Sequence, residues 1–174
     1  MKKYNIPGQI HFVTIKTYKN RTFFKDSNCC NILLNEISFY NNKLNFRFFG
    51  YVIMPNHAHL LIEPNDAINI SKIIQCIKTV SAKKVKRYFF FDHSTGSWDD
   101  VVPATRREKT FHLWQPNFFD FNVYTESKFI EKLNYIHNNP VGAGLVDDIE
   151  DWVYSSWHNY HCRHSVPIKV EFME

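Results

Sequence analysis

Two histidines separated by a single residue, His57 and His59, have a type and spacing that could do chemistry. They begin residues 57–62, an apolar run that predicts a β-strand. Because successive side chains on a strand alternate between its two sides, both imidazoles should face the same way and could share one metal ion. Such an ion would keep coordination positions open for a substrate. Two surface or partly buried histidines without any ligand are the alternative.

The second candidate is Tyr135, in a helix predicted over residues 125–138. The inward stripe of that helix is predicted to consist of Phe129, Ile130, Leu133 and Ile136. Tyr135 lies away from this stripe, Asn139 follows one turn later, and Lys128 and Lys132 lie on the same side. Lysines could neutralise a phosphate there and help to activate the phenol as a nucleophile. A partly exposed tyrosine beside solvated lysines is the other interpretation.

Two further groups of polar residues are weaker candidates. Gln115 and Asp120 lie in an aromatic segment and could stand beside a metal ion, although a role in anchoring the core is the favoured interpretation. Near the end of the chain, four residues of metal-binding type are His158, His161, Cys162 and His164. Zinc fingers need a second pair of ligands at a defined spacing, and this chain has none, so a zinc site is not expected.

Positive charge is concentrated in one predicted helix. The chain carries a formal net charge of +4, which is only mildly basic. Residues 71–91, however, contain six basic residues and no acidic residue: Lys72, Lys78, Lys83, Lys84, Lys86 and Arg87. A basic patch of this kind is typical of a surface that binds nucleic acid. A solvated helix face without a partner is the alternative.

The elements that must position these residues follow from hydrophobic periodicity and turn signals. Strands are predicted at residues 10–17, 46–54 and 57–62, partly extended chain at 111–123, and helices at 26–40, 70–90 and 125–138. Asparagines at 41–42 should end the first helix, Pro140 should end the last, and residues 92–109 should form a polar loop. This order predicts an α+β, ferredoxin-like domain, a mainly antiparallel sheet with helices packed on one face.

The length and composition of the chain limit the number of domains and the cellular location to expect. The 174 residues suit a single domain spanning 1–174. No apolar run is long enough to span a membrane, and the first residues lack the apolar core of a signal peptide. The four cysteines form no CxxC pair. We therefore expect a cytoplasmic protein with reduced thiols and no membrane partner.

The candidate residues occur together in a recognisable order. The stretches that carry it are residues 51–61 (YVIMPNHAHLL), 113–115 (LWQ), 119–120 (FD), 134–146 (NYIHNNPVGAGLV) and 152–156 (WVYSS). This ordered set resembles the REP-associated tyrosine transposases, which are single-tyrosine HUH transposases of bacterial insertion sequences. The resemblance covers roughly residues 4–160, and it leaves 161–174 as a C-terminal tail.

The resemblance implies a function. It implies that His57 and His59 hold a divalent ion, Mg²⁺ or Mn²⁺, that Asn139 completes the site, and that Tyr135 is the nucleophile. The reaction would cleave and rejoin single-stranded or hairpin DNA through a 5′-phosphotyrosine, with the basic helix following phosphates.

Two other functions remain open from the sequence. One is a nucleic-acid-binding module that has lost catalysis, and the other is a metal-dependent nuclease that uses water as its nucleophile. The sequence specifies neither the DNA target nor a role in mobilising an element or serving a host. It also leaves a monomer and a homodimer open.

Overall fold

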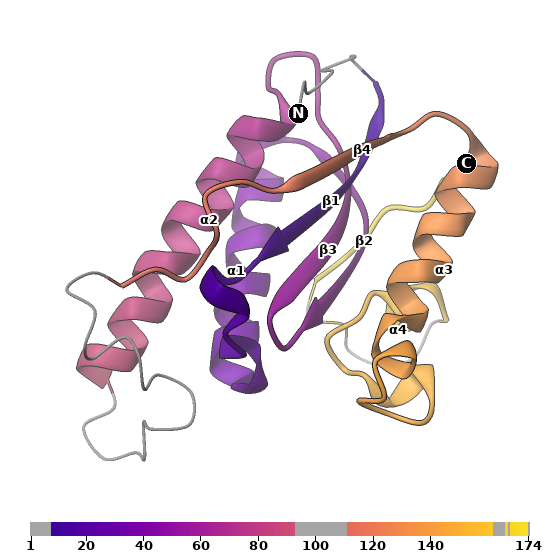
Figure 1. Cartoon of the computed structure of the whole chain (residues 1–174). Coiled ribbons are helices and arrows are strands. Elements are labelled where there is room, and N and C mark those ends of the chain that lie inside the picture. The colour runs from indigo at the N-terminus through magenta and orange to yellow at the C-terminus, as the bar shows by residue number, and fades with distance from the viewer. Residues whose placement is uncertain (1–7, 93–110, 162–165, 167, 174) are drawn as a thin grey trace.

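The computed structural model of the chain describes residues 8–92, 111–161, 166 and 168–173 (Figure 1). The sheet contains β1 (Ile10–Lys16), β2 (Arg47–Met54), β3 (His57–Glu63) and β4 (Phe119–Val123). The helices are α1 (Ser27–Leu44), α2 (Ile70–Arg87), α3 (Glu126–Gly142) and the short α4 (Trp157–Tyr160). The strand order is β2-β3-β1-β4, with every neighbouring pair antiparallel. The predicted α+β fold with an antiparallel sheet is confirmed.

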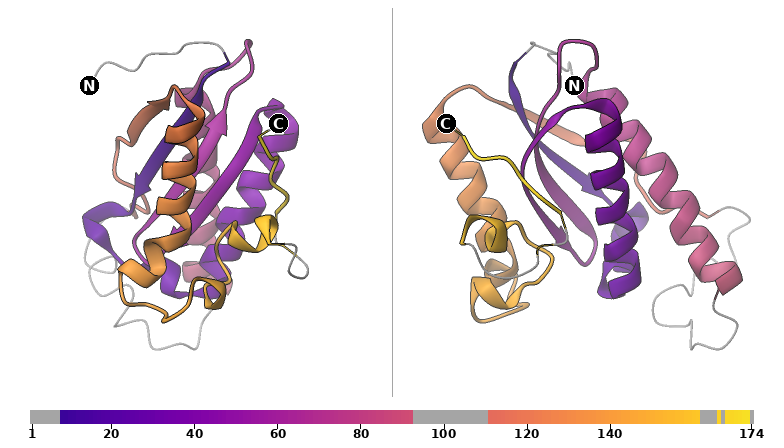
Figure 2. Two further views of the ribbon diagram at one scale, coloured as in Figure 1. Left: turned by 90° about the vertical axis from the view of Figure 1, so that its right-hand side faces the viewer. Right: turned by 180° about the vertical axis from the view of Figure 1, so that it is seen from behind.

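The helices cover both faces of the sheet rather than one. Helices α1 and α2 lie on one face, whereas α3 lies on the other (Figure 2). The expectation of helices on a single face was therefore wrong for α3. The reason lies in the sheet itself, because β2 is buried at seven consecutive positions and both of its sides are apolar. A sheet that is apolar on both sides needs a cover on each side.

Helix α1 runs one turn further than predicted. Its first turn is capped by Asp26, whose side chain accepts a hydrogen bond from the Asn28 backbone. Its end is at Asn45, which adopts the left-handed conformation with φ 49°. The asparagines at 41–42 do not break the helix, because the Asn41 amide bonds the Phe46 carbonyl across the turn. Tertiary contacts thus outweigh the weak local propensity of these residues.

Helix α3 also continues past its predicted end, with Pro140 inside its final turn. A proline there removes only one backbone hydrogen bond, and its ring is buried. The turn closes through the Ala143 amide, which donates to the Asn139 carbonyl over 3.0 Å. Asn139 therefore stays helical, one turn after Tyr135.

The C-terminal part of the chain lies along the outer edge of β2. Backbone amides of Ser156 and Glu171 donate to the carbonyls of Tyr51 and Phe48, and the Ile53 amide donates to Tyr154. The tail expected after residue 160 is thus attached to the sheet over part of its length. Most of the loop predicted at 92–109 lies outside the described residues. Among the described helices, none is long and apolar enough to cross a membrane.

Candidate active site

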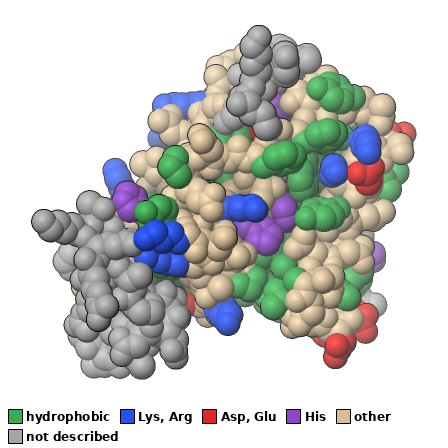
Figure 3. Space-filling view, in the orientation of Figure 1, with side chains coloured by type: hydrophobic (Ala, Val, Ile, Leu, Met, Phe, Trp, Pro, Cys, Tyr) green, Lys and Arg blue, Asp and Glu red, His purple; other side chains and the backbone are tan. Residues whose placement is uncertain are grey.

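His57 and His59 lie side by side on the face of the sheet that α3 covers. Their ring centroids are 4.8 Å apart, whereas Ala58 and Leu60 point into the core beneath α1 and α2. The alternation predicted from the sequence is therefore confirmed. Figure 3 shows histidine atoms reaching the surface near the middle of the view, beside a basic side chain and among hydrophobic ones. Of the pair, His57 is partly exposed to solvent, whereas His59 is 4% exposed.

Both imidazoles are oriented by hydrogen bonds at Nδ1. The Nδ1 of His57 lies 2.7 Å from the Asn56 side-chain oxygen, and the Nδ1 of His59 lies 2.8 Å from the Thr14 hydroxyl. Because an amide oxygen only accepts, His57 carries its proton on Nδ1, and its Nε2 keeps a lone pair. The same tautomer of His59 leaves its Nε2 lone pair to face Asn139, whose amide nitrogen is 3.4 Å away.

The surroundings keep both histidines neutral. Burial, followed by the positive charge of Lys16, lowers the pKa of His57 to about 4. Burial, followed by the charges of His57 and Lys16, lowers the pKa of His59 to about 3. A neutral imidazole is the form that binds a metal ion, so both side chains are ready as ligands at neutral pH.

Tyr135 stands directly over this pair. Its ring centroid is 5.2 Å from that of His59 and 5.8 Å from that of Phe12, in edge-to-face contacts. The side chain is 49% exposed, and within the described part of the chain its hydroxyl has no hydrogen-bond partner. The phenol is therefore fixed through its ring while its oxygen is left to react. The expected position off the buried stripe of α3 is confirmed.

The buried stripe itself differs from the prediction at one position. Phe129 and Ile136 are buried and Leu133 is partly buried, but Ile130 is 50% exposed. The buried side continues instead through His137 and Pro140. The stripe is thus rotated slightly from the predicted one, and Tyr135 remains at its border rather than beneath it.

Close packing sets the distance between α3 and the sheet. Gly50 of β2 lies under Leu133, and a Cβ atom at this glycine would be 3.0 Å from Leu133 Cδ1. The same atom would be 3.3 Å from the Ser156 hydroxyl, which also bonds Nε2 of His137 over 3.0 Å. The helix that carries Tyr135 therefore rests against backbone, with two polar groups satisfied beneath it.

The lysines of α3 are only partly available to a phosphate. Lys128 and Lys132 both form ion pairs with Glu131; the side chains of Lys128 and Glu131 are about half exposed, and that of Lys132 is less exposed. Lys132 also lies 5.5 Å above the Phe12 ring, next to the tyrosine and the histidine. Of the two predicted lysines, Lys132 is therefore the one that borders the site.

Asp120 does not belong to the site. Its carboxylate bonds Nδ1 of His11 over 2.8 Å, and both side chains are buried on the sheet face that α1 and α2 cover. Because β4 alternates, Phe119 rather than Asp120 faces the histidines, as its contact with Phe12 shows. The suggested support from Asp120 was wrong. Gln115 contributes its backbone, which donates to the Lys16 carbonyl.

The C-terminal histidines give no zinc centre in the described structure. His161 stacks on Trp157 with ring centroids 4.0 Å apart, and its Nδ1 bonds the Trp157 carbonyl. Cys162 and His164 lie outside the described residues, while His158 is within them. Across the described ranges, no three His, Cys, Asp or Glu side chains cluster as metal ligands. A metal at the His57–His59 pair would therefore rely on amide, water or substrate oxygens.

The basic helix presents some of its predicted cations and uses others internally. Five basic residues of α2 are exposed: Lys72, Lys83, Lys84, Lys86 and Arg87. Lys84 forms an ion pair with the buried Glu36. Lys78 donates to the carbonyls of Gln115, Pro116 and Asn117 at 2.6, 3.0 and 3.2 Å, so its three donors are used. Lys78 is a structural residue, contrary to its expected part in a DNA surface.

Three residues next to the site were missed by sequence reasoning. Thr14 orients His59, Asn56 orients His57, and Lys16 pairs across the strands with His57. Asn56 could have been noticed, since it directly precedes the histidine motif in a turn. Thr14 and Lys16 depend on the register between β1 and β3, which no local pattern in the sequence specifies.

Comparison of the sequence with models of protein families shows which family has this arrangement of residues. The family model described as "Transposase IS200 like" matches residues 6–139, which include both histidines, the tyrosine and Asn139. The chain belongs to the IS200-like transposase family. Membership agrees with the resemblance found in the ordered sequence motifs.

Individual members of the family are distant from this chain in sequence. A REP-associated tyrosine transposase of Escherichia coli is 22% identical over 168 residues, covering 96% of this chain and 87% of that protein. A Haemophilus influenzae protein assigned to the same group is 27% identical over 114 residues, which is 65% of this chain and 60% of that protein. The solved structure of a REP-associated tyrosine transposase bound to a REP hairpin superposes with a TM-score of 0.70 at 20% identity, covering 100% and 93% of the two chains. That likeness establishes a shared fold.

Proposed function

We propose that this protein is a DNA-strand transferase that cleaves and rejoins single-stranded or hairpin DNA through a covalent bond to Tyr135. The observation that carries the proposal is the meeting of groups from two separate elements, Tyr135 on α3 and the histidine pair on β3. The Tyr135 hydroxyl has no hydrogen-bond partner among the described residues, and its ring centroid lies 5.2 Å from that of His59, one of two neutral histidines on the same side of β3. Family membership supports the same activity.

The residues fit a divalent cation between the histidines and α3. Both imidazoles are neutral, and hydrogen bonds at Nδ1 leave Nε2 as the coordinating atom. Turning the Asn139 amide about its last side-chain bond would direct its oxygen to the place its nitrogen occupies, 3.4 Å from His59 Nε2. Imidazole nitrogen with amide and water oxygen suits Mn²⁺ or Mg²⁺. Such an ion would polarise the scissile phosphate.

The chain's own groups account for the remaining chemistry. The Tyr135 oxygen forms a bond to phosphorus and releases its proton to solvent. The bond from phosphorus to the 3′-oxygen breaks, and that oxygen takes up a proton to become a free 3′-hydroxyl. The 5′-phosphate remains on the tyrosine until another 3′-hydroxyl reverses the attack. Lys16, beside His57, and Lys132, above Phe12, would offset the charge of the phosphate.

The proposed partner is DNA with unpaired nucleotides. The exposed cations of α2 provide a phosphate track, and exposed aromatic residues near the site, such as Phe119, offer surfaces for bases. A similarly folded transposase has been solved with a REP hairpin bound, which supports a hairpin substrate for this chain. The proposal covers monomeric and dimeric forms alike.

Tyr135→Phe tests the proposal because it removes only the hydroxyl. The protein is incubated with Mg²⁺ or Mn²⁺ and a library of labelled hairpin DNAs, then separated on a denaturing gel. The wild type should form a covalent adduct, and the variant should form none while still binding DNA. An adduct formed by the variant would identify another nucleophile. Cleavage without an adduct in the wild type would favour the water-dependent nuclease, and binding alone would favour an inactive module.

A further inference from the structure

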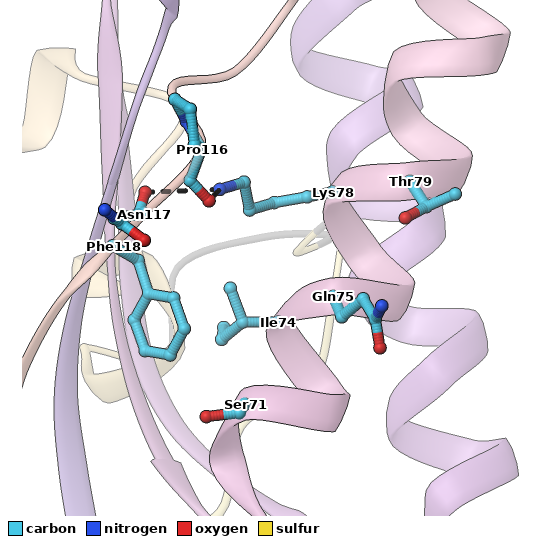
Figure 4. A pocket seen from close by; sticks show the side chains of 8 residues that line it. All are labelled: Ser71, Ile74, Gln75, Lys78, Thr79, Pro116, Asn117 and Phe118. Atoms are coloured by element: carbon cyan, nitrogen blue, oxygen red, sulfur yellow. Dashed lines mark hydrogen bonds between the residues drawn. The ribbon is translucent and has the colours of Figure 1, made fainter. Parts of the chain in front are cut away.

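A pocket on the face opposite the histidines points to a second contact with the substrate. It lies between α2 and residues 116–118, the segment that leads into β4 (Figure 4). The pocket encloses about 260 Å³, somewhat less than a typical site for a drug-sized ligand. Its lining residues are Ser71, Ile74, Gln75, Lys78, Thr79, Pro116, Asn117 and Phe118. A flat ligand of one or two rings would fill it.

The pocket combines apolar and polar side chains. Two apolar side chains, Ile74 of α2 and Phe118, point toward each other from opposite sides of the pocket in Figure 4. Asn117 lies next to Phe118 and brings an amide with donors and an acceptor, whereas the Gln75 side chain extends from α2 away from Phe118 (Figure 4). An aromatic surface beside mixed donors and acceptors matches a heteroaromatic ring with a polar edge.

The pocket is rigid at its centre. The Lys78 ammonium crosses from α2 to residues 115–117 and bonds three backbone carbonyls there, as Figure 4 shows in part. Its donors are therefore directed at the protein itself, and no acidic residue lines the pocket. The interior is suited to an uncharged group rather than to a phosphate.

Charge surrounds the pocket without entering it. Along α2, the residues Lys72, Gln75, Thr79 and Lys83 lie on one side, because their spacings of three and four follow the helical repeat. The two lysines, both exposed, bracket the two polar pocket residues. At about 1.5 Å per residue they are roughly 16 Å apart along the axis, enough for several nucleotides. The arrangement suits a neutral ring whose flanking groups are anionic.

The pocket is also close to the proposed active site around the edge of the sheet. Phe118 packs towards α2, whereas its neighbour Phe119 contacts Phe12 on the histidine side. In the sheet, Phe119 pairs with Thr14, and Thr14 pairs with His59. Two strand spacings, about 10 Å, therefore separate His59 from the edge. A DNA strand leaving the site can pass round β4 to α2.

We propose that this pocket binds an unpaired nucleobase of the DNA substrate, while Lys72 and Lys83 hold the adjoining phosphates. The inference rests on the proposed function, because the DNA strand whose base enters the pocket is the one that reaches Tyr135. The base would stack on Phe118 and present its polar edge to the neighbouring Asn117 amide. The pocket thereby becomes a recognition site for a nucleotide outside the reacting phosphodiester.

The test compares single strands with and without bases, so it needs no knowledge of the target sequence. Fluorescence anisotropy measures the affinity of labelled oligothymidylate and of a fully abasic strand of the same length. The wild type should prefer the base-bearing strand, and Asn117→Ala and Phe118→Leu should each reduce that preference about fivefold or more. Asn31→Ala, an exposed amide on α1, is the matched control and should leave it unchanged.

Each outcome decides one part of the inference. If Asn117→Ala and Phe118→Leu both keep the wild-type preference for bases, the pocket does not bind a base. If Lys72→Ala weakens both strands equally while the pocket variants change nothing, α2 only follows phosphates and the proposal is overturned. Failure of the proposed function appears separately, as an absent Tyr135 adduct, and leaves these affinities measurable. Asn117 is exposed, so its truncation spares the fold.

Discussion

The two faces of the sheet differ in how they are covered and in what they bury. Beneath α1 and α2, β3 contributes Ala58, Leu60 and Ile62 to a large core of aliphatic and aromatic side chains. Beneath α3, the same strand places His59 and Leu61, and the core there is a smaller cluster. The face under α1 and α2 thus contributes most of the apolar packing. The face under α3 combines a smaller apolar cluster with histidines, which are costly to bury. A single strand serves both because its side chains alternate.

The sharpest way to test this contrast is to truncate adjacent residues of β3. His59→Ala should reduce adduct formation roughly a thousandfold or more, because it removes a proposed ligand of the ion that polarises the phosphate. Its thermal stability should change little. Leu60→Ala should destabilise the fold by about 2–5 kcal/mol through the cavity it creates, while the folded fraction keeps its activity.

Adduct assays and thermal denaturation on the same preparations separate these outcomes. His57→Ala is the companion of His59→Ala and should behave in the same way. Equal loss of activity in the histidine and leucine variants at a temperature where both are folded would remove the distinction between the two faces.

Acid should destabilise the protein through the face that carries the histidines. Burial, followed by His161 and His158, lowers the pKa of His137 to about 4, while an unfolded chain has the ordinary value of 6.5. Between these values the unfolded state binds a proton that the native state excludes, so stability falls as pH decreases from 6.5 to 4. His137→Gln should lessen this slope by about 1.4 kcal/mol per pH unit.

Urea denaturation of the wild type and His137→Gln over this pH range measures the slope. His57 and His59, with pKa values lowered to about 4 and 3, contribute in the same direction and should remain visible in the variant. A wild-type stability that is constant from pH 6.5 to 4 would contradict native-state burial of neutral histidines.

The next largest effect should come from losing the hydrogen bond that orients the His59 ring. Thr14→Val keeps the shape of the side chain but removes the hydroxyl that bonds Nδ1 over 2.8 Å. Loss of such an outer partner typically weakens metal binding about 10–100-fold. Calorimetric titration with Mn²⁺ measures the change, and Thr14→Ser, which retains the hydroxyl, should bind almost as the wild type does. If both variants bind Mn²⁺ equally, the hydroxyl does not orient the ligand.

The smallest expected effect distinguishes two lysines of α2. Lys83→Ala should weaken binding of single-stranded DNA a few-fold and lower the slope of its salt dependence by about one. Lys78→Ala should leave that slope unchanged and reduce stability instead, because the ammonium bonds three carbonyls of the protein. Anisotropy titrations at several salt concentrations provide the comparison, and identical slopes for Lys83→Ala and the wild type would remove Lys83 from the DNA surface.

Local periodicity was enough to predict much of the site. The alternation of β3 predicted that His57 and His59 share a side, and helical spacing predicted that Tyr135 lies off the buried stripe. What failed depends on long-range packing. Ile130 looked buried in a helical projection, yet the sheet meets α3 along a line closer to His137.

Strand register accounts for the other errors. Whether Asp120 or Phe119 faces the histidines depends on how β4 pairs with β1, and a shift of one residue would exchange them. The roles of Thr14 and Lys78 likewise depend on partners 45 and 37 residues away in the chain. The resemblance to a transposase family supplied the roles of the site residues, but it did not supply these supporting contacts.

The close contact at Gly50 helps to set how near α3 lies to the sheet at the active site. Helix α3 carries Tyr135 two residues beyond Leu133, and Leu133 Cδ1 would lie only 3.0 Å from a Cβ added at the glycine. A methyl group there would force Leu133 or the helix that carries it to give by a few tenths of an ångström, directly beneath the turn that holds the phenol. The height of the nucleophile above the imidazoles thus depends in part on a missing side chain on β2, a strand that carries none of the reacting groups.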